Sequence, residues 1–250
     1  MLKLKIADEL GRQRKHPHSK EFSEVSMRQI KNEILAAFLF VLGACAPGSH
    51  EKAALPAPLC VAVAYDVSGS VAQLELPVMK MEHVDKIISL VKQRGGCLAF
   101  GLIDEKAFAP LARLELLQVS GKLNERARIN QKNEKGEAEF RELVEKKINR
   151  PRNARRTDFN GSIARLALFF NEPSVAENGE KVALVSSDGI DTGAWRTLKG
   201  IKLPKDVKVY VVGMEENLAR KFFGQQATLF EGIDAAIESL SPKSNKESRS

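Results

Sequence analysis

Residues 59–70 read LCVAVAYDVSGS, and this stretch decides the fold. Leu59 to Tyr65 is almost wholly apolar, which is typical of a strand covered on both faces. Further along the chain, short apolar runs alternate with longer amphipathic ones, as in βαβ units. The sequence therefore predicts an α/β fold: a Rossmann-like, doubly wound and mostly parallel sheet with helices on both faces, in which this strand is central.

Other elements follow from the same patterns. Pro77 suits the first turn of a helix that Gly95 and Gly96 end. Asn160 or Ser162 can cap a helix that continues to about residue 170. We also expect strands at 97–103, 111–119 (at an edge of the sheet), 181–185, 207–212 and 227–230, and helices at 194–198, 217–223 and 233–240.

Composition and charge limit the function classes. Of the 250 residues, 43% are hydrophobic and 28% charged, as in folded soluble proteins. The net charge is +7, and much of the excess lies in the hydrophilic, insertion-like region 120–156. There, only Phe140, Leu143, Val144 and Ile148 form an apolar stripe on a helix. No basic patch is interleaved with several aromatic residues that could stack on bases, so nucleic acid is not an expected partner.

The N-terminal region contains an export-type segment. Residues 34–45 read ILAAFLFVLGAC, too short for a membrane span but right for a secretory core that follows Arg28 and Lys31. The end of this run resembles a bacterial lipobox, with Cys45 as the lipidated residue. A start at Met27 would make 1–26 an upstream extension, 27–45 the signal peptide and 46–58 a linker.

This interpretation places the protein on a bacterial membrane, facing the periplasm or the exterior, with a lipid anchor. The alternative is a cytoplasmic protein in which residues 33–44 form a buried or amphipathic helix. The tail 241–250 lacks apolar residues and is expected to be disordered. Cys60 and Cys97 open neighbouring strands at the same end, where a disulfide is sterically possible. Two buried free thiols are the simpler expectation.

Polar side chains gather in three loops at expected strand ends. Asp66 begins an acid-x-hydroxyl-Gly-hydroxyl loop directly after the first strand. Thr157 precedes a helix, and Asp188 follows the strand 181–185. Because carboxyl ends of parallel strands meet at one rim, where ligands bind, these loops should converge. Their carboxylates and hydroxyls are oxygen donors of the kind that Mg²⁺ prefers.

In type, order and spacing these residues resemble the metal-ion-dependent adhesion site of von Willebrand factor type A domains: Asp66, Ser68, Ser70, Thr157 and Asp188. The resemblance covers residues 59–240 and implies one Mg²⁺ or Mn²⁺. It implies that Ser68 and Ser70 bind the metal directly, that the two aspartates act through water, and that Thr157 does either. An Asp or Glu side chain of a partner protein would complete the coordination.

Small departures and alternatives remain. Ser187 stands where Thr is more usual, and Asp158 and Asp191 are interpreted as plain caps. An enzyme is not expected: a phosphotransferase usually has a second carboxylate where Ser68 stands, and His83 is the only histidine of the domain. A basic scaffold that binds RNA or an assembly through residues 122–156 is the other alternative.

Overall fold

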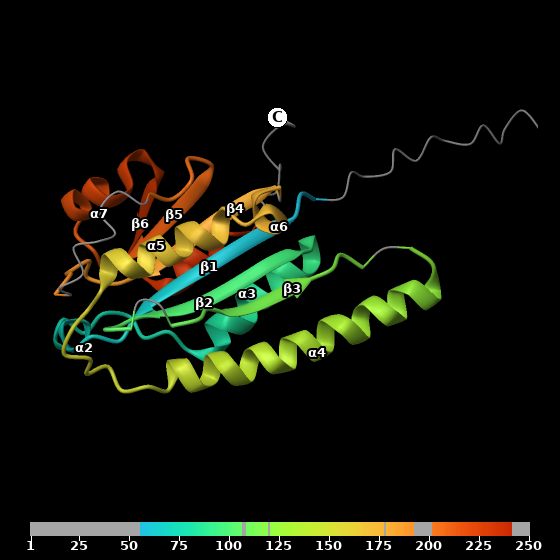
Figure 1. Ribbon diagram of the computed structural model, residues 1–250, viewed down its shortest axis with the longest axis horizontal. Helices are drawn as coiled ribbons and strands as arrows, with labels where there is room; N and C mark the ends of the chain where they lie inside the picture. The colour runs from blue at the N-terminus through green and yellow to red at the C-terminus, as the bar shows by residue number, and fades with distance from the viewer. Residues whose placement is uncertain (1–55, 107–108, 120, 178, 193–201, 242–250) are drawn as a thin grey trace, which may run out of the picture. The chain divides into compact units, whose positions relative to one another are not determined.

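The computed structural model describes residues 56–106, 109–119, 121–177, 179–192 and 202–241 (Figure 1). The chain divides into two units, residues 1–54 and 55–250, and every described residue belongs to the second. Several predictions fall outside the described residues: the extension, the signal peptide, the lipidated Cys45, most of the linker, the helix at 194–198 and nearly all of the tail.

A six-stranded sheet forms the centre of the described unit. In spatial order the strands are β3 (Ala112–Leu116), β2 (Gly96–Ile103), β1 (Leu59–Asp66), β4 (Glu180–Ser186), β5 (Val207–Val212) and β6 (Ala227–Phe230). All neighbours are parallel except β2 and β3. The predicted α/β class, the interior position of β1 and the edge position of β3 are thereby confirmed.

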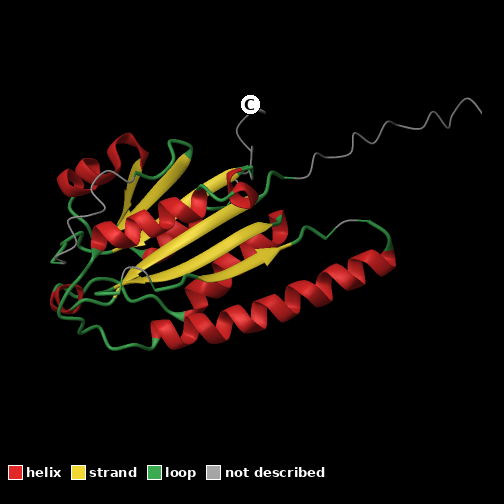
Figure 2. Cartoon of the chain, viewed as in Figure 1, coloured by secondary structure: helices red, strands yellow, loops and turns green. Residues whose placement is uncertain are grey.

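Helices cover both faces of the sheet (Figure 2). Alternate residues of β1 serve the two faces, as the pleat requires: Val61 and Val63 belong to one core cluster, and Ala62 and Ala64 to the other. The first cluster includes residues of α3 (Met81–Arg94), α4 (Leu123–Ile148) and α8 (Ile233–Glu238). The second includes residues of α5 (Phe159–Phe170), α6 (Pro173–Ala176) and α7 (Glu216–Phe223).

Two local predictions were wrong, and one element was missed. The helix after the first strand begins at Met81 rather than near Pro77, because the backbone N–H of Lys80 donates to His83 Nδ1, which caps the helix there. A short helix, α2 (Gly69–Gln73), was not predicted. Helix α5 is capped by Asp158, whose carboxylate accepts from the Gly161 N–H at 2.8 Å. This residue lies before both Asn160 and Ser162, the caps that we expected.

The hydrophilic region after β3 is mostly one long helix, α4 (Figure 1). Phe140 and Val144 are buried against the first core cluster, but Leu143 is 49% exposed and lies off the predicted stripe. The amide of Asn133 donates to the Leu117 carbonyl and accepts from the Leu117 N–H, which satisfies the backbone just beyond β3. The part of α4 that contains Asn133, Phe140 and Val144 therefore has a structural role.

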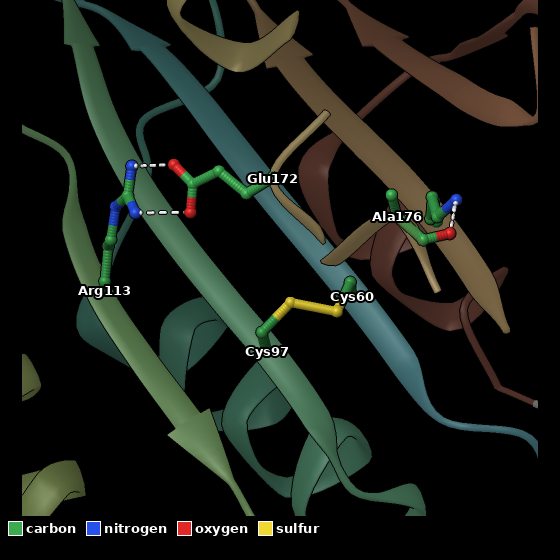
Figure 3. The surroundings of a disulfide bond; sticks show 6 residues. Cys60, Cys97, Arg113, Glu172 and Ala176 are labelled. Atoms are coloured by element: carbon green, nitrogen blue, oxygen red, sulfur yellow. Dashed lines mark hydrogen bonds and ion pairs between the residues drawn. A yellow bond between two sulfur atoms is a disulfide. The ribbon is translucent and has the colours of Figure 1, made fainter. Parts of the chain in front are cut away.

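A disulfide joins the two strands at the start of the sheet (Figure 3). The parallel register sets Cys60 opposite Cys97 with their Cα atoms 4.5 Å apart, a separation that a disulfide spans. The expectation of two free thiols was therefore wrong. Nearby, the Arg113 guanidinium makes two 2.7 Å hydrogen bonds to the Glu172 carboxylate, which joins β3 to the residue before α6.

Candidate metal site

The site lies where the winding direction of the sheet reverses. From β1 the chain proceeds to β2 and β3 on one side, and it later returns to β4, β5 and β6 on the other. The carboxyl ends of β1 and β4 therefore adjoin at a switch point, which is where open α/β sheets bind ligands. Asp66 is the last residue of β1, and Asp188 lies two residues beyond β4.

The loop after β1 is held by its own side chains. The buried carboxylate of Asp66 accepts a 2.8 Å hydrogen bond from the Ser68 N–H, which folds the chain back at once. This turn brings the hydroxyl oxygens of Ser68 and Ser70 to 3.0 Å from each other. Three of the five predicted ligand residues are therefore in one hydrogen-bonded group.

The spacing of the two hydroxyls suits an octahedral cation. Ligand oxygens of Mg²⁺ lie at 2.0–2.1 Å, so two adjacent ones are about 2.9 Å apart. The Ser68 and Ser70 oxygens lie 3.0 Å apart. The hydrogen bond that joins them thus sets the two oxygens at a separation that adjacent ligands of Mg²⁺ also have.

The loop after β4 adds the second acid. Ser187 donates to the other carboxylate oxygen of Asp66 at 2.6 Å and accepts from the Gly189 N–H at 3.0 Å. Asp188 is 7% exposed, and its Oδ1 accepts from the Ile190 N–H at 2.9 Å. Its Oδ2 is buried without a hydrogen-bond partner. Such an orphaned carboxylate oxygen is costly and calls for a donor or a cation.

The two acids also influence each other. Burial raises the pKa of Asp66, hydrogen bonds from Ser187 and Ser68 oppose that rise, and the negative charge of Asp188 adds to it. These two buried carboxylates are thus close enough to repel each other, and a divalent cation beside them would relieve both the burial cost and the repulsion.

Thr157 is brought to the same rim by its neighbours. Ala154 pairs with the loop after β1, accepting from the Gly69 N–H at 3.1 Å and donating to the Val67 carbonyl at 3.1 Å. On the other side, the Thr157 N–H donates to the Thr192 hydroxyl at 2.8 Å, and its carbonyl accepts from the Thr192 N–H at 3.0 Å. Thr157 is therefore fixed between the two acidic loops.

Two arginines that the sequence did not single out for the site lock this segment. Arg152 donates to the backbone carbonyls of Leu76 and Val71 at 2.9 and 3.1 Å, and so holds the loop after β1. Arg150 makes a 2.8 Å ion pair with the buried Asp104, at the end of β2. Only the crowding of basic residues before Thr157 could have drawn attention to them.

The neighbouring acids have mainly capping roles. Asp158 caps α5 as described, although its Oδ2 is also buried without a partner. Asp191 Oδ2 accepts hydrogen bonds from the backbone and side chain of Asn160. The interpretation of these two acids as caps is therefore confirmed for the carboxylate oxygens that accept hydrogen bonds.

The donor set fits a hard cation bound by hydroxyls and carboxylates. Within the described ranges, no three His, Cys, Asp or Glu side chains are grouped as a metal site would require. Among the predicted ligands only Asp66 and Asp188 are acids, and the other donors are hydroxyls, the pattern that the resemblance implies. No helix in the described part of the chain is long and apolar enough to cross a bilayer.

Comparisons with known proteins give distant structural similarities. The sequence matches no protein-family model and no curated protein. The manganese-loaded TRAP protein of Plasmodium vivax is 13% identical, with a TM-score of 0.43 over 74% of this chain and 72% of that one. Proximal thread matrix protein 1 from the mussel byssus, with a zinc-occupied MIDAS motif, is 14% identical, with a TM-score of 0.38 over 74% of this chain.

The pilus adhesin SpaC from Lactobacillus rhamnosus GG is 11% identical, with a TM-score of 0.42 over 74% of this chain. The matches span 46% of the mussel protein and 29% of the pilus adhesin. At these identities and TM-scores the similarities do not assign the chain to a family.

Proposed function

We propose that this chain is a von Willebrand factor type A-like module that binds Mg²⁺, or Mn²⁺ in its place, and captures a carboxylate of a partner protein. Ser68, Ser70 and Thr157 would provide neutral oxygens, and Asp66 and Asp188 the negative charge. A cation held largely by hydroxyls stays electrophilic, and it can take an Asp or Glu oxygen of the partner as a further ligand.

The observation that carries the proposal is the buried, unpartnered Oδ2 of Asp188 beside the buried Asp66. A carboxylate oxygen that is hidden from water and has no donor destabilises the fold unless something binds it. The two serine hydroxyls, 3.0 Å apart, belong to the same rim.

We also propose that the protein is exported and anchored in a bacterial membrane through Cys45. The disulfide between Cys60 and Cys97 supports this location, because disulfides persist in oxidising compartments and are rare in the cytosol. A cytoplasmic location is the alternative. Finding the thiols reduced in freshly isolated protein would favour it.

An enzymatic role as a phosphotransferase has less support. Its nucleophile would be Asp66, but that side chain is 1% exposed and both of its oxygens already accept hydrogen bonds, from the Ser68 N–H and the Ser187 hydroxyl. Substrate could reach neither oxygen without breaking the loop.

The test is a calorimetric titration of the full chain with Mg²⁺ and with Mn²⁺, in the presence and absence of acetate. We expect one metal ion per chain and tighter binding with acetate. The Ser68→Ala variant should lose at least about tenfold in affinity, because it removes a ligand. Ser68 is preferable to Asp66 for this purpose, since removing the Asp66 carboxylate would also release two loops.

Ser89→Ala is the matched control, because Ser89 is an exposed residue within α3, outside the loops that carry the predicted ligands. It should bind Mg²⁺ as the native chain does. If the native chain binds neither metal, or if Ser68→Ala binds with native affinity, the proposed site is wrong.

A further inference from the structure

The structure divides four closely spaced arginines into two pairs. Arg150 and Arg152 are committed internally, to Asp104 and to the carbonyls of Leu76 and Val71. Arg155 and Arg156 are exposed and make no hydrogen bond or ion pair within the described residues. Two guanidinium groups are therefore available to a partner.

These two arginines lie within the rim of the candidate metal site. The residue before them, Ala154, pairs with Ser68, and the residue after them, Thr157, is a predicted ligand. Since adjacent Cα atoms are only about 3.8 Å apart, both arginines start within two residues of points fixed to the site.

Exposed apolar side chains occur in the segments that follow β1 and β4, which carry the predicted aspartate ligands. Leu74 follows α2 and is 58% exposed, and Ile190 follows Asp188 and is 47% exposed. Neither offers a flat ring for stacking on a base, but both can pack against side chains of a protein. This combination fits a protein surface better than a nucleic acid.

We infer that Arg155 and Arg156 select an acidic segment of a partner protein, in which one carboxylate binds the metal and a second, near it in sequence, pairs with these arginines. The inference rests on the proposed metal site and adds to it the feature that distinguishes an acidic cluster from a single Asp or Glu. Arginine suits the role because its planar fork pairs with carboxylates through two hydrogen bonds.

A second group of exposed basic residues, at the start of α4, lies too far away to act with this pair. Lys122 and the first turns of α4, with Arg126, Arg128 and Lys132, are exposed. Figure 1 shows that α4 begins at the end of the sheet opposite α2, which marks the rim. Between these two groups, the exposed basic side chains of Lys135, Arg141 and Lys146 are each paired with an acid, Glu139, Asp85 and Glu142. The described residues from 122 to 156 therefore do not present an unbroken basic track of the kind that an RNA-binding scaffold would need.

The test compares two blocked synthetic peptides of equal length, one with a single Asp and one with that Asp followed by two Glu. Binding to the full chain is measured by fluorescence anisotropy in Mg²⁺ and in EDTA. In Mg²⁺ the triply acidic peptide should bind about three- to tenfold more tightly, as expected for two solvent-exposed ion pairs. Added salt should reduce this preference, because salt screens exposed charges.

The double variant Arg155→Gln/Arg156→Gln should lose the preference. Arg126→Gln/Arg128→Gln is the matched control, because it removes the same charge at the distant end of α4 and should keep the preference. Circular dichroism and a Mg²⁺ titration check that each variant is folded and retains the metal site.

The outcomes separate the two levels of the proposal. If neither peptide binds more tightly in Mg²⁺ than in EDTA, the proposed metal function fails. If both peptides bind in a Mg²⁺-dependent way with equal affinity, or if the arginine variant keeps the preference, only the arginine inference is overturned. If a dT oligonucleotide binds through Arg155 and Arg156 without Mg²⁺ while the peptides are not distinguished, the pair is a nucleic-acid contact instead.

Discussion

The two ends of the sheet treat their carboxylates in opposite ways. At the amino end, Glu180 has both oxygens paired at 2.8 Å, one with Arg94 and one with Lys208, and Cys60 is bonded to Cys97. At the carboxyl end, Asp188 leaves one buried oxygen without a partner.

This difference separates stability from function. Groups that satisfy one another inside the chain need nothing from outside, and their role is complete when the protein is folded. An unpaired buried carboxylate lowers stability and persists where a ligand makes use of it. The amino end is therefore the place to change stability, and the carboxyl end is the place to change binding.

The largest expected effect is at the amino end. Replacing both cysteines, as Cys60→Ala/Cys97→Ala, removes a bond across a sequence separation of 37 residues. The chain-entropy relation gives a loss of roughly 4 kcal/mol in the free energy of unfolding. Urea denaturation measures it as a lower midpoint.

The same variant tests whether the two ends are independent. While it is folded, its Mg²⁺ affinity should equal that of the native chain, because the disulfide lies at the opposite end of β1 from the metal site. A weakened metal affinity in the folded variant would contradict the proposed division between the ends.

The next effect is that of the paired charges. Glu180→Gln removes the anion that pairs with Arg94, whose side chain is only 9% exposed and would be left with an uncompensated charge. We expect a loss of about 2 kcal/mol in the free energy of unfolding. Glu177→Gln, at an exposed position after α6, is the control and should change stability little. Equal effects of both variants would show that the ion pair adds nothing.

A gain in stability is expected at the carboxyl end. Asp188→Asn keeps the oxygen that accepts from the Ile190 N–H but removes a buried negative charge next to Asp66. In EDTA the variant should be more stable than the native chain by about 1 kcal/mol, because a neutral amide is cheaper to bury than a carboxylate. Thermal unfolding measures this difference.

With Mg²⁺ present the order should reverse. The native chain gains stability from bound metal, and the variant gains less, because it binds the ion more weakly. If Asp188→Asn were less stable than the native chain in EDTA, Asp188 would be a structural residue, and the contrast between the two ends would fail.

The sequence predicted the sheet well because strand ends, glycines and apolar runs are local signals. It placed β5 and β6 within the bounds that the structure gives, and it placed Asp66 and Asp188 at or just beyond the ends of β1 and β4. It could not predict the roles of Arg150 and Arg152, since these depend on carbonyls and an acid that are distant along the chain. Free thiols were wrongly preferred to the disulfide for the same reason: two neighbouring strands allow the bond, but only their register places the cysteines opposite each other.

The smallest effect is a pH dependence at the amino end. Burial raises the pKa of Glu180, but hydrogen bonds from Lys208 and Arg94 outweigh it, so the net pKa lies below the ordinary value of 4.5. A carboxyl whose pKa is lowered on folding stabilises the native state above its unfolded pKa, and that contribution is lost as pH falls through the folded pKa. The stability difference between the native chain and Glu180→Gln should therefore be constant above pH 4.5 and shrink below it. Because the other carboxyls titrate equally in both proteins, they cancel in this difference. A difference that stayed constant into acid would mean that the variant acts through packing and not through the charge of Glu180.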